Sequence, residues 1–243
     1  MNISGKVALI TGSAKRIGRM TAIEFAKRGA RVAVHFRSSL KEAEETLRLI
    51  QSVGASGALF QADLSDLSAV QHMFQKLEQT FGGLDILVNS ASTFHTGTSD
   101  ETSAELWDEQ MSSNARAPFF VAQSAARMML QRGSGKIVNL VDVAGEVIWP
   151  GYFAYSVSKA ALIAVNRGMA KAYSPAIQVN GIAPGPVLFP DHYTEEQKRS
   201  AIERTLLKRP GSPTDIVNAI VFLVENDYIT GEIIHVDGGR HIM

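Results

Sequence analysis

Val7-Ala-Leu-Ile-Thr-Gly12-Ser-Ala-Lys15-Arg16-Ile17-Gly18 is the stretch that sets the fold class of this chain. Its apolar start, Val7–Ile10, predicts a buried strand, and residues 17, 21 and 25 then repeat at helical spacing. A strand, a glycine loop and a helix in this order are the context that a dinucleotide-binding loop requires. Glycine lets the backbone approach a pyrophosphate, and the free N–H groups at the start of the helix attract its charge.

The rest of the chain repeats this alternation of strand and helix. Further strands are predicted at residues 31–36, 58–62, 84–88, 136–141, 177–182 and 233–236. Such a pattern is typical of an α/β fold, a Rossmann-type doubly wound parallel sheet of about seven strands with helices on both faces. We expect a single domain over residues 1–243, with the cofactor half at about 1–135 and the catalytic and substrate half at about 136–243.

Composition restricts the classes of function. The formal charge balances to zero and no long run of Lys or Arg occurs, so neither nucleic-acid nor membrane binding is expected. The absence of cysteine excludes disulfides and thiolate catalysis, and none of the six histidines stands in a metal-binding cluster, so no metal site is expected. No signal peptide or membrane-spanning run is found, which predicts a cytoplasmic protein.

A second stretch, residues 135–159, carries the candidate chemistry. It reads GKIVNLVDVAGEVIWPGYFAYSVSK and joins a predicted strand to a predicted helix. Tyr155 and Lys159 are four residues apart, so both side chains leave one helix face and can meet one small molecule. Because a neighbouring ammonium favours the phenolate, we expect Lys159 to lower the pKa of Tyr155. By itself, however, a Tyr-x-x-x-Lys pair is more typical of a core tyrosine beside a solvated lysine.

Other motifs occur with this pair in a characteristic order. Gly12 lies in the glycine loop, Asn89 and Asn114 follow the fourth predicted strand, and Pro184-Gly185 follows the sixth. With these motifs the chain resembles the short-chain dehydrogenase/reductase family over nearly its whole length. The resemblance implies hydride transfer between a nicotinamide cofactor and a small-molecule substrate.

The resemblance also implies roles for individual residues. The catalytic group would be Asn114, Asp142, Tyr155 and Lys159, with Asn114 holding a water in a proton relay to the lysine. The cofactor would contact a larger set: Gly12, Lys15, Arg16, Ile17, Gly18, Arg37, Ser38, Ser39, Asp63, Leu64, Asn89, Ala91, Ser92, Tyr155, Lys159, Pro184, Gly185 and Val187. Pro118 is expected to open the helix near Asn114, because proline has no N–H to donate.

The end of the second strand indicates the type of cofactor. An acidic side chain there would bind the adenosine ribose and repel a 2′-phosphate, but the sequence reads His35-Phe36-Arg37-Ser38-Ser39. Arg37, the two hydroxyls and Lys15 or Arg16 would make a cationic pocket for a phosphate. We therefore expect NADP(H). The alternative is that Arg37 is a solvated loop residue.

Asp142 departs from the pattern of the family, in which most members have a serine that donates a hydrogen bond to the substrate carbonyl. An ionised carboxylate only accepts hydrogen bonds and repels the oxyanion that forms when a ketone is reduced. A substrate with N–H donors, such as a reduced pterin, fits better. Together with Arg16, Ser92, Phe94 and the ending DGGRHI, Asp142 makes the chain resemble the pteridine reductases and bacterial dihydromonapterin reductases.

This finer resemblance implies a substrate site made by Arg16, Ser92, Phe94, Asp142 and Tyr155. Phe94 would stack the pterin against the nicotinamide, and Asp142 and Tyr155 would handle protons. We expect an NADPH-dependent reductase of a dihydropteridine, of pterin or folate type. Two alternatives stay open: a carbonyl reductase, for instance of 3-oxoacyl thioesters, and a catalytically weak NADP(H)-binding protein.

Two further expectations concern assembly and the substrate side. Residues 117–129 and 160–170 are richer in alanine and other apolar residues than one sheet face needs, which predicts a homo-oligomer, a tetramer. Arg240 would then reach the site of a neighbouring subunit. A Thr-Glu-Glu-Gln capping box predicts a helix over 194–207 beside the substrate.

Overall fold

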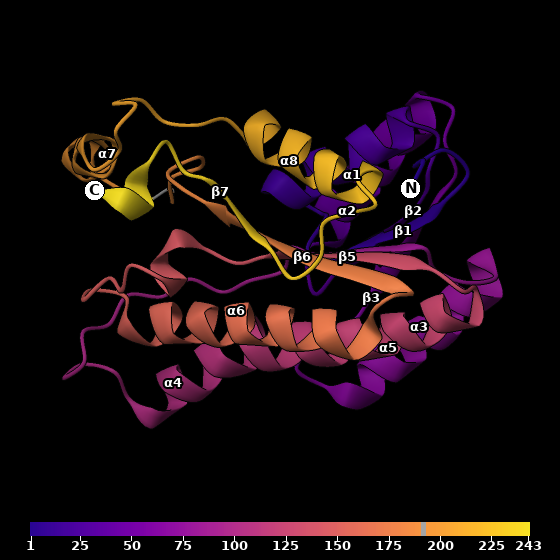
Figure 1. The fold of residues 1–243 in the computed structure, drawn as a ribbon, viewed down its shortest axis with the longest axis horizontal. Coiled ribbons are helices and arrows are strands. Elements are labelled where there is room, and N and C mark those ends of the chain that lie inside the picture. The colour runs from indigo at the N-terminus through magenta and orange to yellow at the C-terminus, as the bar shows by residue number, and fades with distance from the viewer. Residues whose placement is uncertain (191–192) are drawn as a thin grey trace.

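One parallel sheet organises the molecule (Figure 1). The computed structural model describes residues 1–190 and 193–243, and within them seven strands lie in the order β3-β2-β1-β4-β5-β6-β7. The strands are β1 (Val7–Ile10), β2 (Arg31–Phe36), β3 (Gly57–Gln61), β4 (Ile86–Asn89), β5 (Gly135–Leu140), β6 (Ile177–Pro184) and β7 (Ile233–Val236). The predicted doubly wound α/β fold is confirmed.

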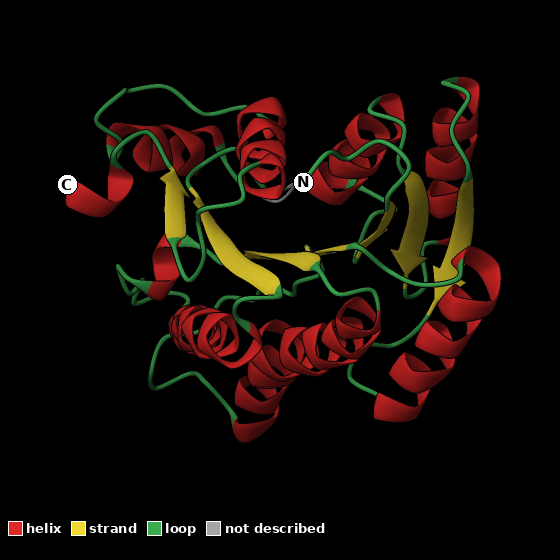
Figure 2. Ribbon diagram, turned by 45° about the vertical axis from the view of Figure 1, so that its right-hand side comes forward, coloured by secondary structure: helices red, strands yellow, loops and turns green. Residues whose placement is uncertain are grey.

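Helices cover both faces of this sheet (Figures 1 and 2). One face carries α1 (Arg16–Lys27), α2 (Leu40–Ser52) and α8 (Pro213–Glu225). The other carries α3 (Leu67–Phe81), α5 (Ala117–Gln131) and α6 (Phe153–Tyr173), with α4 (Ala104–Met111) packed on α6. The short α7 (Glu195–Glu203) and the C-terminal turn η3 (Arg240–Ile242) lie together at one end of the molecule.

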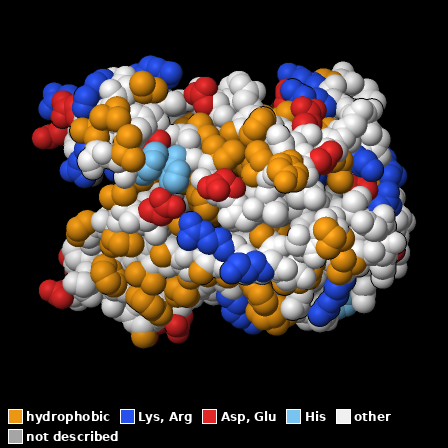
Figure 3. Space-filling view, in the orientation of Figure 1, with side chains coloured by type: hydrophobic (Ala, Val, Ile, Leu, Met, Phe, Trp, Pro, Cys, Tyr) orange, Lys and Arg blue, Asp and Glu red, His pale blue; other side chains and the backbone are white. Residues whose placement is uncertain are grey.

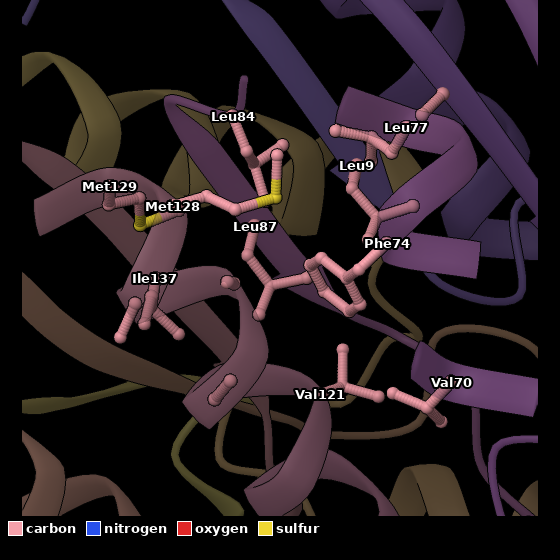
Figure 4. Packing of buried hydrophobic residues seen from close by; sticks show 14 of the residues in the cluster. Leu9, Val70, Phe74, Leu77, Leu84, Leu87, Val121, Met128, Met129 and Ile137 are labelled. Atoms are coloured by element: carbon pink, nitrogen blue, oxygen red, sulfur yellow. The ribbon is translucent and has the colours of Figure 1, made fainter. Parts of the chain in front are cut away.

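The core consists of two apolar layers, one on each face of the sheet. Successive side chains of a strand point to opposite faces, so Leu9 joins the layer under α3 and α5 while Ile10 joins the layer under α1 and α8. Figure 4 shows Leu9, Leu87 and Ile137 of three strands packed against helix residues such as Phe74. Because both faces are buried, the strands are nearly continuous apolar runs, which made them visible in the sequence.

The sheet order creates a crevice at the carboxyl ends of β1 and β4. After β3 the chain crosses to the other side of β1, so the connections from β1 and β4 run to opposite faces, the usual place for a ligand in this fold. Thr11 ties the two loops together, since its Oγ1 accepts hydrogen bonds from the backbone N–H groups of Ser90 (2.9 Å) and Ala91 (3.0 Å). This crevice holds the candidate site.

The helical segment that contains Asn114 is interrupted in its middle. The π-helical turn Ser112–Arg116 separates α4 from α5, which has Pro118 in its first turn. The expected opening of the helix is confirmed, and the buried Asn114 lies within the π turn. The helix predicted at 194–207 ends earlier, at Glu203, but its capping box at Thr194 is present.

Candidate active site

A cleft of about 1390 Å³ opens along the carboxyl ends of the strands. Arg37, after β2, lies on its wall at one end, and Asp142, after β5, lies on its wall nearer the other. Every site residue predicted from the sequence lines this cleft except Asn89 and Asn114, which are buried behind it. The structure therefore brings the predicted residues together from separate parts of the chain.

The glycine loop is shaped by close backbone contacts. A Cβ atom on Gly18 would lie 2.6 Å from the carbonyl oxygen of Gly12, so only glycine lets α1 begin this close to the loop. Arg16 has a φ of +54°, in the left-handed region that costs a residue with a side chain about 1–2 kcal/mol. Glycine would adopt this backbone conformation without the steric cost. The Arg16 guanidinium donates a hydrogen bond to the carbonyl of Leu188 (2.8 Å) and so links two loops over the cleft.

His35 supports the glycine loop through a hydrogen bond to Gly12, a role that was not predicted from the sequence. The backbone N–H of Gly12 donates to His35 Nδ1 (3.0 Å), and Nε2 lies 3.1 Å from the carbonyl of Ala62. Nδ1 must therefore be an acceptor, which places the proton on Nε2 and keeps the ring neutral. Burial lowers the pKa of His35 to about 4. The position of a histidine next to the end of β2 was the available signal.

The basic residues proposed for a phosphate pocket differ in their partners. Lys15 pairs with the carboxylate of Glu42 (2.7 Å), which offsets its charge. Arg37 makes no salt bridge with any described carboxylate, and its backbone carbonyl accepts a hydrogen bond from Gln61 (3.0 Å). Arg37, with Ser38 beside it on the cleft wall, is therefore the stronger candidate for binding a phosphate.

Tyr155 and Asp142 form the central contact of the site. The Tyr155 hydroxyl donates a hydrogen bond to Asp142 Oδ2 (2.8 Å), and the backbone N–H of Ala144 donates to Oδ1 (2.8 Å). Lys159 Nζ donates to the carbonyl of Leu140 (3.0 Å) and lies 5.7 Å from the centre of the Tyr155 ring. A proton donor, an acceptor and an ammonium group thus meet at one end of the cleft.

The titration of these groups differs from the expectation in one respect. Burial, and next the negative charge of Asp142, raise the pKa of Tyr155 well above its usual value, so the expected lowering by Lys159 is wrong. The physical reason is that Lys159 points to a backbone carbonyl, whereas Asp142 directly accepts the phenol proton. Burial lowers the pKa of Lys159 to about 8, against the attraction of Asp142.

Asp142 keeps part of its surface open to the cleft, yet it lies deep in the protein. This burial raises the pKa of its carboxyl, while the Ala144 N–H and then the charge of Lys159 act in the opposite direction. Because Asp142 accepts hydrogen bonds at both oxygens, it acts as an acceptor in this structure. Tyr155 is correspondingly a phenol that retains its proton.

Asn114 positions the loop that carries Phe94. Its Oδ1 accepts a hydrogen bond from the backbone N–H of Thr93 (3.0 Å), and its Nδ2 donates to the Thr93 carbonyl (3.0 Å) and to Ser158 (3.1 Å). Gln110, fully buried, donates to the Thr93 hydroxyl (3.0 Å). The side chain of Asn114 is thus occupied by protein groups, and its role in a proton relay stays a prediction.

An aromatic wall closes the substrate end. Phe94 stacks on Tyr152 with ring centres 4.4 Å apart, and it meets Tyr155 edge-on at 4.7 Å. The Arg240 guanidinium lies 4.4 Å from the centre of the Trp149 ring. The sequence predicted Phe94 but not Tyr152 or Trp149, although aromatic residues at 149, 152 and 155 are a recognisable signal. Arg240 lines the cleft of its own chain, and its reach to a neighbouring subunit's site stays a prediction.

Other classes of site find no support within residues 1–190 and 193–243. No group of three or more His, Asp or Glu side chains there could hold a metal ion, and His192 lies outside the described residues. No described helix is long and apolar enough to cross a membrane. Figure 3 shows acidic and basic side chains scattered among apolar ones over the face that it presents.

Comparison with known proteins identifies the family. Residues 12–241 match the sequence model of a family described as enoyl-(acyl carrier protein) reductase. Together with the relatives below, this match shows that the chain belongs to the short-chain dehydrogenase/reductase family of oxidoreductases. The family-level resemblance predicted from the sequence is therefore confirmed.

Three relatives cover almost the whole chain. The chain is 38% identical over 250 residues to a protein of Thermotoga maritima described as an uncharacterized oxidoreductase, with 98% of each covered. It is 34% identical over 242 residues to the 3-oxoacyl-[acyl-carrier-protein] reductase FabG of Staphylococcus aureus, again with 98% of each covered. The structure of the angucycline C-6 ketoreductase LanV with bound NADP has a TM-score of 0.92 at 29% identity, covering 100% of this chain and 98% of LanV. None of the three is described as a pteridine reductase.

The role of His35 predicts a pH-dependent loss of stability. The unfolded chain takes up a proton near pH 6.5, whereas folded His35 does so only near pH 4, so stability falls as pH falls through this window. The loss from this residue should approach about 3 kcal/mol at pH 4. We expect denaturant unfolding of His35→Gln to show a weaker decline from pH 7 to 4 than the parent protein. Parallel declines would contradict the assigned role.

Proposed function

We propose that this protein is an NADPH-dependent reductase that delivers a hydride to a small substrate held in the cleft beside Tyr155 and Asp142. The observation that carries the proposal is the hydrogen bond of 2.8 Å from Tyr155 to Asp142. Tyr155 and Asp142 lie at one end of a cleft, and the glycine loop and Arg37 on its other walls suit a dinucleotide. The bound NADP of the related ketoreductase LanV supports the choice of cofactor.

The residues of the cleft fit NADP(H) at both of its ends. The close approach of Gly12 and Gly18 leaves backbone N–H groups free at the start of α1 for a pyrophosphate. Arg37 and Ser38 would hold the 2′-phosphate, and Lys159 would hold the nicotinamide ribose. When bound, the nicotinamide supplies the hydride.

The protein groups then handle the proton. Tyr155 keeps its proton, so it can donate a hydrogen bond or the proton itself to the atom that becomes negative during reduction. Asp142 would orient Tyr155 and accept a hydrogen bond from the substrate. Lys159 carries its positive charge below about pH 8 and adds favourable potential for developing negative charge.

Asp142 and Phe94 favour a flat heterocycle as the substrate. The Asp142 carboxylate accepts hydrogen bonds, which suits ring or amino N–H groups, and Phe94 lines the cleft as part of the aromatic wall that it forms with Tyr152. A dihydropteridine of pterin or folate type is a flat heterocycle with such N–H groups. The side-chain chemistry of the site is the support for this substrate.

Reduction of a carbonyl, such as a 3-oxoacyl thioester, is the second candidate. The comparisons favour it over a pterin, because the named relatives are a 3-oxoacyl reductase and a ketoreductase. In that case Tyr155 alone would donate to the oxyanion, with Asp142 as a less favourable neighbour. A catalytically weak NADP(H)-binding protein is less well supported, since such a protein has no chemical use for the arrangement of Tyr155, Lys159 and Asp142.

The cofactor proposal predicts a preference for NADPH. The dissociation constant of NADPH should be at least about tenfold lower than that of NADH, a difference of about 1.4 kcal/mol. Arg37→Ala should remove most of this preference, whereas Lys41→Ala, which changes a lysine outside the cleft, should leave it intact. Fluorescence titration measures both constants. Equal affinities in the parent protein would contradict the phosphate pocket.

The substrate proposal predicts opposite effects of one mutation on two reactions. Asp142→Ser removes the acceptor for substrate N–H groups and restores the serine typical of the family. Dihydropterin turnover should fall about 10- to 1000-fold, because a charge-assisted hydrogen bond is worth roughly 1.5–3 kcal/mol and proton transfer is also impaired. Reduction of a simple activated ketone should stay level or rise.

Two control measurements accompany the Asp142→Ser variant. Tyr155→Phe removes the phenol needed by both reactions and should reduce both, while NADPH binding to Asp142→Ser should hardly change. Steady-state NADPH consumption with dihydropterins, dihydrofolate and 3-oxoacyl thioesters measures the substrate preference. If only 3-oxoacyl thioesters are reduced, the second candidate is correct.

We also propose that the protein forms a symmetric tetramer through α5 and α6. Phe120 on α5 is half-buried, and Ala164 and Gly168 leave an exposed strip on α6. Such apolar and small residues suit close packing between copies. Light scattering at micromolar concentration should give four times the chain mass of 26.3 kDa, and a monomer would contradict the prediction. The cytoplasmic location expected from the sequence stays a prediction.

A further inference from the structure

The cleft has a second polar region beyond Tyr155, where α7 and the C-terminal turn meet. Gln197, Ser200 and Arg204 line the cleft from the side of α7, and Arg240 lines it from the turn. No residue of α7 is buried, so this helix offers a polar surface opposite the aromatic wall. A purely apolar substrate would leave these polar groups without partners.

Two guanidinium groups dominate this region. Arg240 makes one long hydrogen bond, to the carbonyl of Ala201 (3.4 Å), and stacks on Trp149. Arg204 donates to no acceptor among the described residues, and no described carboxylate lies within salt-bridge distance of either guanidinium. Since each guanidinium has five N–H donors, most of this donor capacity is unused.

The charges around Arg240 are of both signs. Burial lowers the pKa of Arg240 and the positive charge of Arg204 acts in the same direction, whereas Asp142, Tyr193 and Asp237 raise it. Glu196 also lines the cleft, but it lies eight residues before Arg204, roughly 12 Å along the helix. The charge of Arg204 thus acts on Arg240, and neither guanidinium makes a salt bridge with a carboxylate of residues 1–190 and 193–243.

We propose that Arg204 and Arg240 form a subsite for an anionic substituent of the substrate, a carboxylate or a phosphate. The guanidinium plane matches either group with paired hydrogen bonds. Stacking on Trp149 restricts Arg240 before the ligand arrives, which reduces the entropy lost on binding. The inference builds on the proposed reductase function and narrows its substrate to molecules with a charged group beside the reducible part.

Direct binding tests the subsite independently of turnover. Calorimetry on the protein saturated with NADP⁺ would compare 4-aminobenzoylglutamate with neutral 4-aminobenzamide, and 4′-phosphopantetheine with pantetheine. The first pair tests a carboxylate and the second a phosphate. We expect the anionic member of one pair to bind at least about tenfold more tightly, and this advantage to shrink as salt is added.

Variants of Arg204 and Arg240 test whether these two residues cause the preference for the anionic ligand. Arg204→Gln and Arg240→Gln should each reduce the preference for the anionic ligand to less than threefold. Arg199→Gln is the matched control, because Arg199 is on the same helix but outside the cleft, with 71% of its side chain exposed. It makes the same change in net charge and should keep the full preference.

Kinetics separates this subsite from the proposed reaction. Two substrate pairs differ in the anionic group: dihydrofolate against 7,8-dihydrobiopterin, and acetoacetyl-CoA against the N-acetylcysteamine thioester of acetoacetate. In whichever pair is reduced, Arg204→Gln should raise KM for the anionic substrate and leave kcat nearly unchanged. If none of these substrates is reduced, the proposed reductase function is wrong. The calorimetric comparison then still shows whether Arg204 and Arg240 bind an anionic group. Equal binding within both ligand pairs overturns the subsite, whichever substrate is reduced.

Discussion

The hydrogen bond from Tyr155 to Asp142 is the interaction on which the chemistry of this site depends. Burial raises the pKa of Tyr155, and the charge and hydrogen bond of the Asp142 carboxylate raise it further, so the phenol keeps its proton. A serine in place of Asp142 would carry no charge and would compete as a donor. The chemistry of this pair thus depends on the charge and on the acceptor role of Asp142.

The fold brings Tyr155 and Asp142 together through a close backbone approach. Asp142 follows β5 and accepts from the N–H of Ala144, which fixes the carboxylate at the start of a short turn. A Cβ on Gly145 would lie 2.8 Å from the carbonyl carbon of Lys159, so this glycine lets the turn press against α6. With any other residue, the turn and α6 would have to separate, and the contact of 2.8 Å would be lost. The close backbone approach at Gly145 thus sets the distance between the Tyr155 hydroxyl and the Asp142 carboxylate.

Local patterns in the sequence predicted the sheet, the glycine loop and the common helix face of Tyr155 and Lys159. These features depend on periodicity and spacing, which a single sequence displays. The direction in which the pKa of Tyr155 shifts could not be predicted, because it depends on the burial of the ring and on Asp142 accepting the phenol proton. The role of His35 likewise became clear only from the structure, in which its ring accepts a hydrogen bond from the backbone N–H of Gly12.

The substrate end was predicted less completely for a related reason. Phe94 was found by resemblance, but Tyr152 and Trp149 gain their meaning only from stacking with Phe94 and Arg240. Arg240 was expected to reach a neighbouring subunit, and its place on the wall of the cleft in its own chain could not be predicted from the sequence.

The central claim is that Asp142 keeps the proton on Tyr155, and the most direct measurement is the titration of this one phenol. NMR of protein labelled with ¹³C at tyrosine Cζ would follow its ionisation, with Tyr155→Phe to assign the signal. The account predicts that Tyr155 in the parent protein is still protonated at pH 10, the usual pKa of tyrosine, and that its pKa falls in Asp142→Asn. Ionisation of Tyr155 well below pH 10 in the parent protein, or an unchanged pKa in Asp142→Asn, would contradict the account.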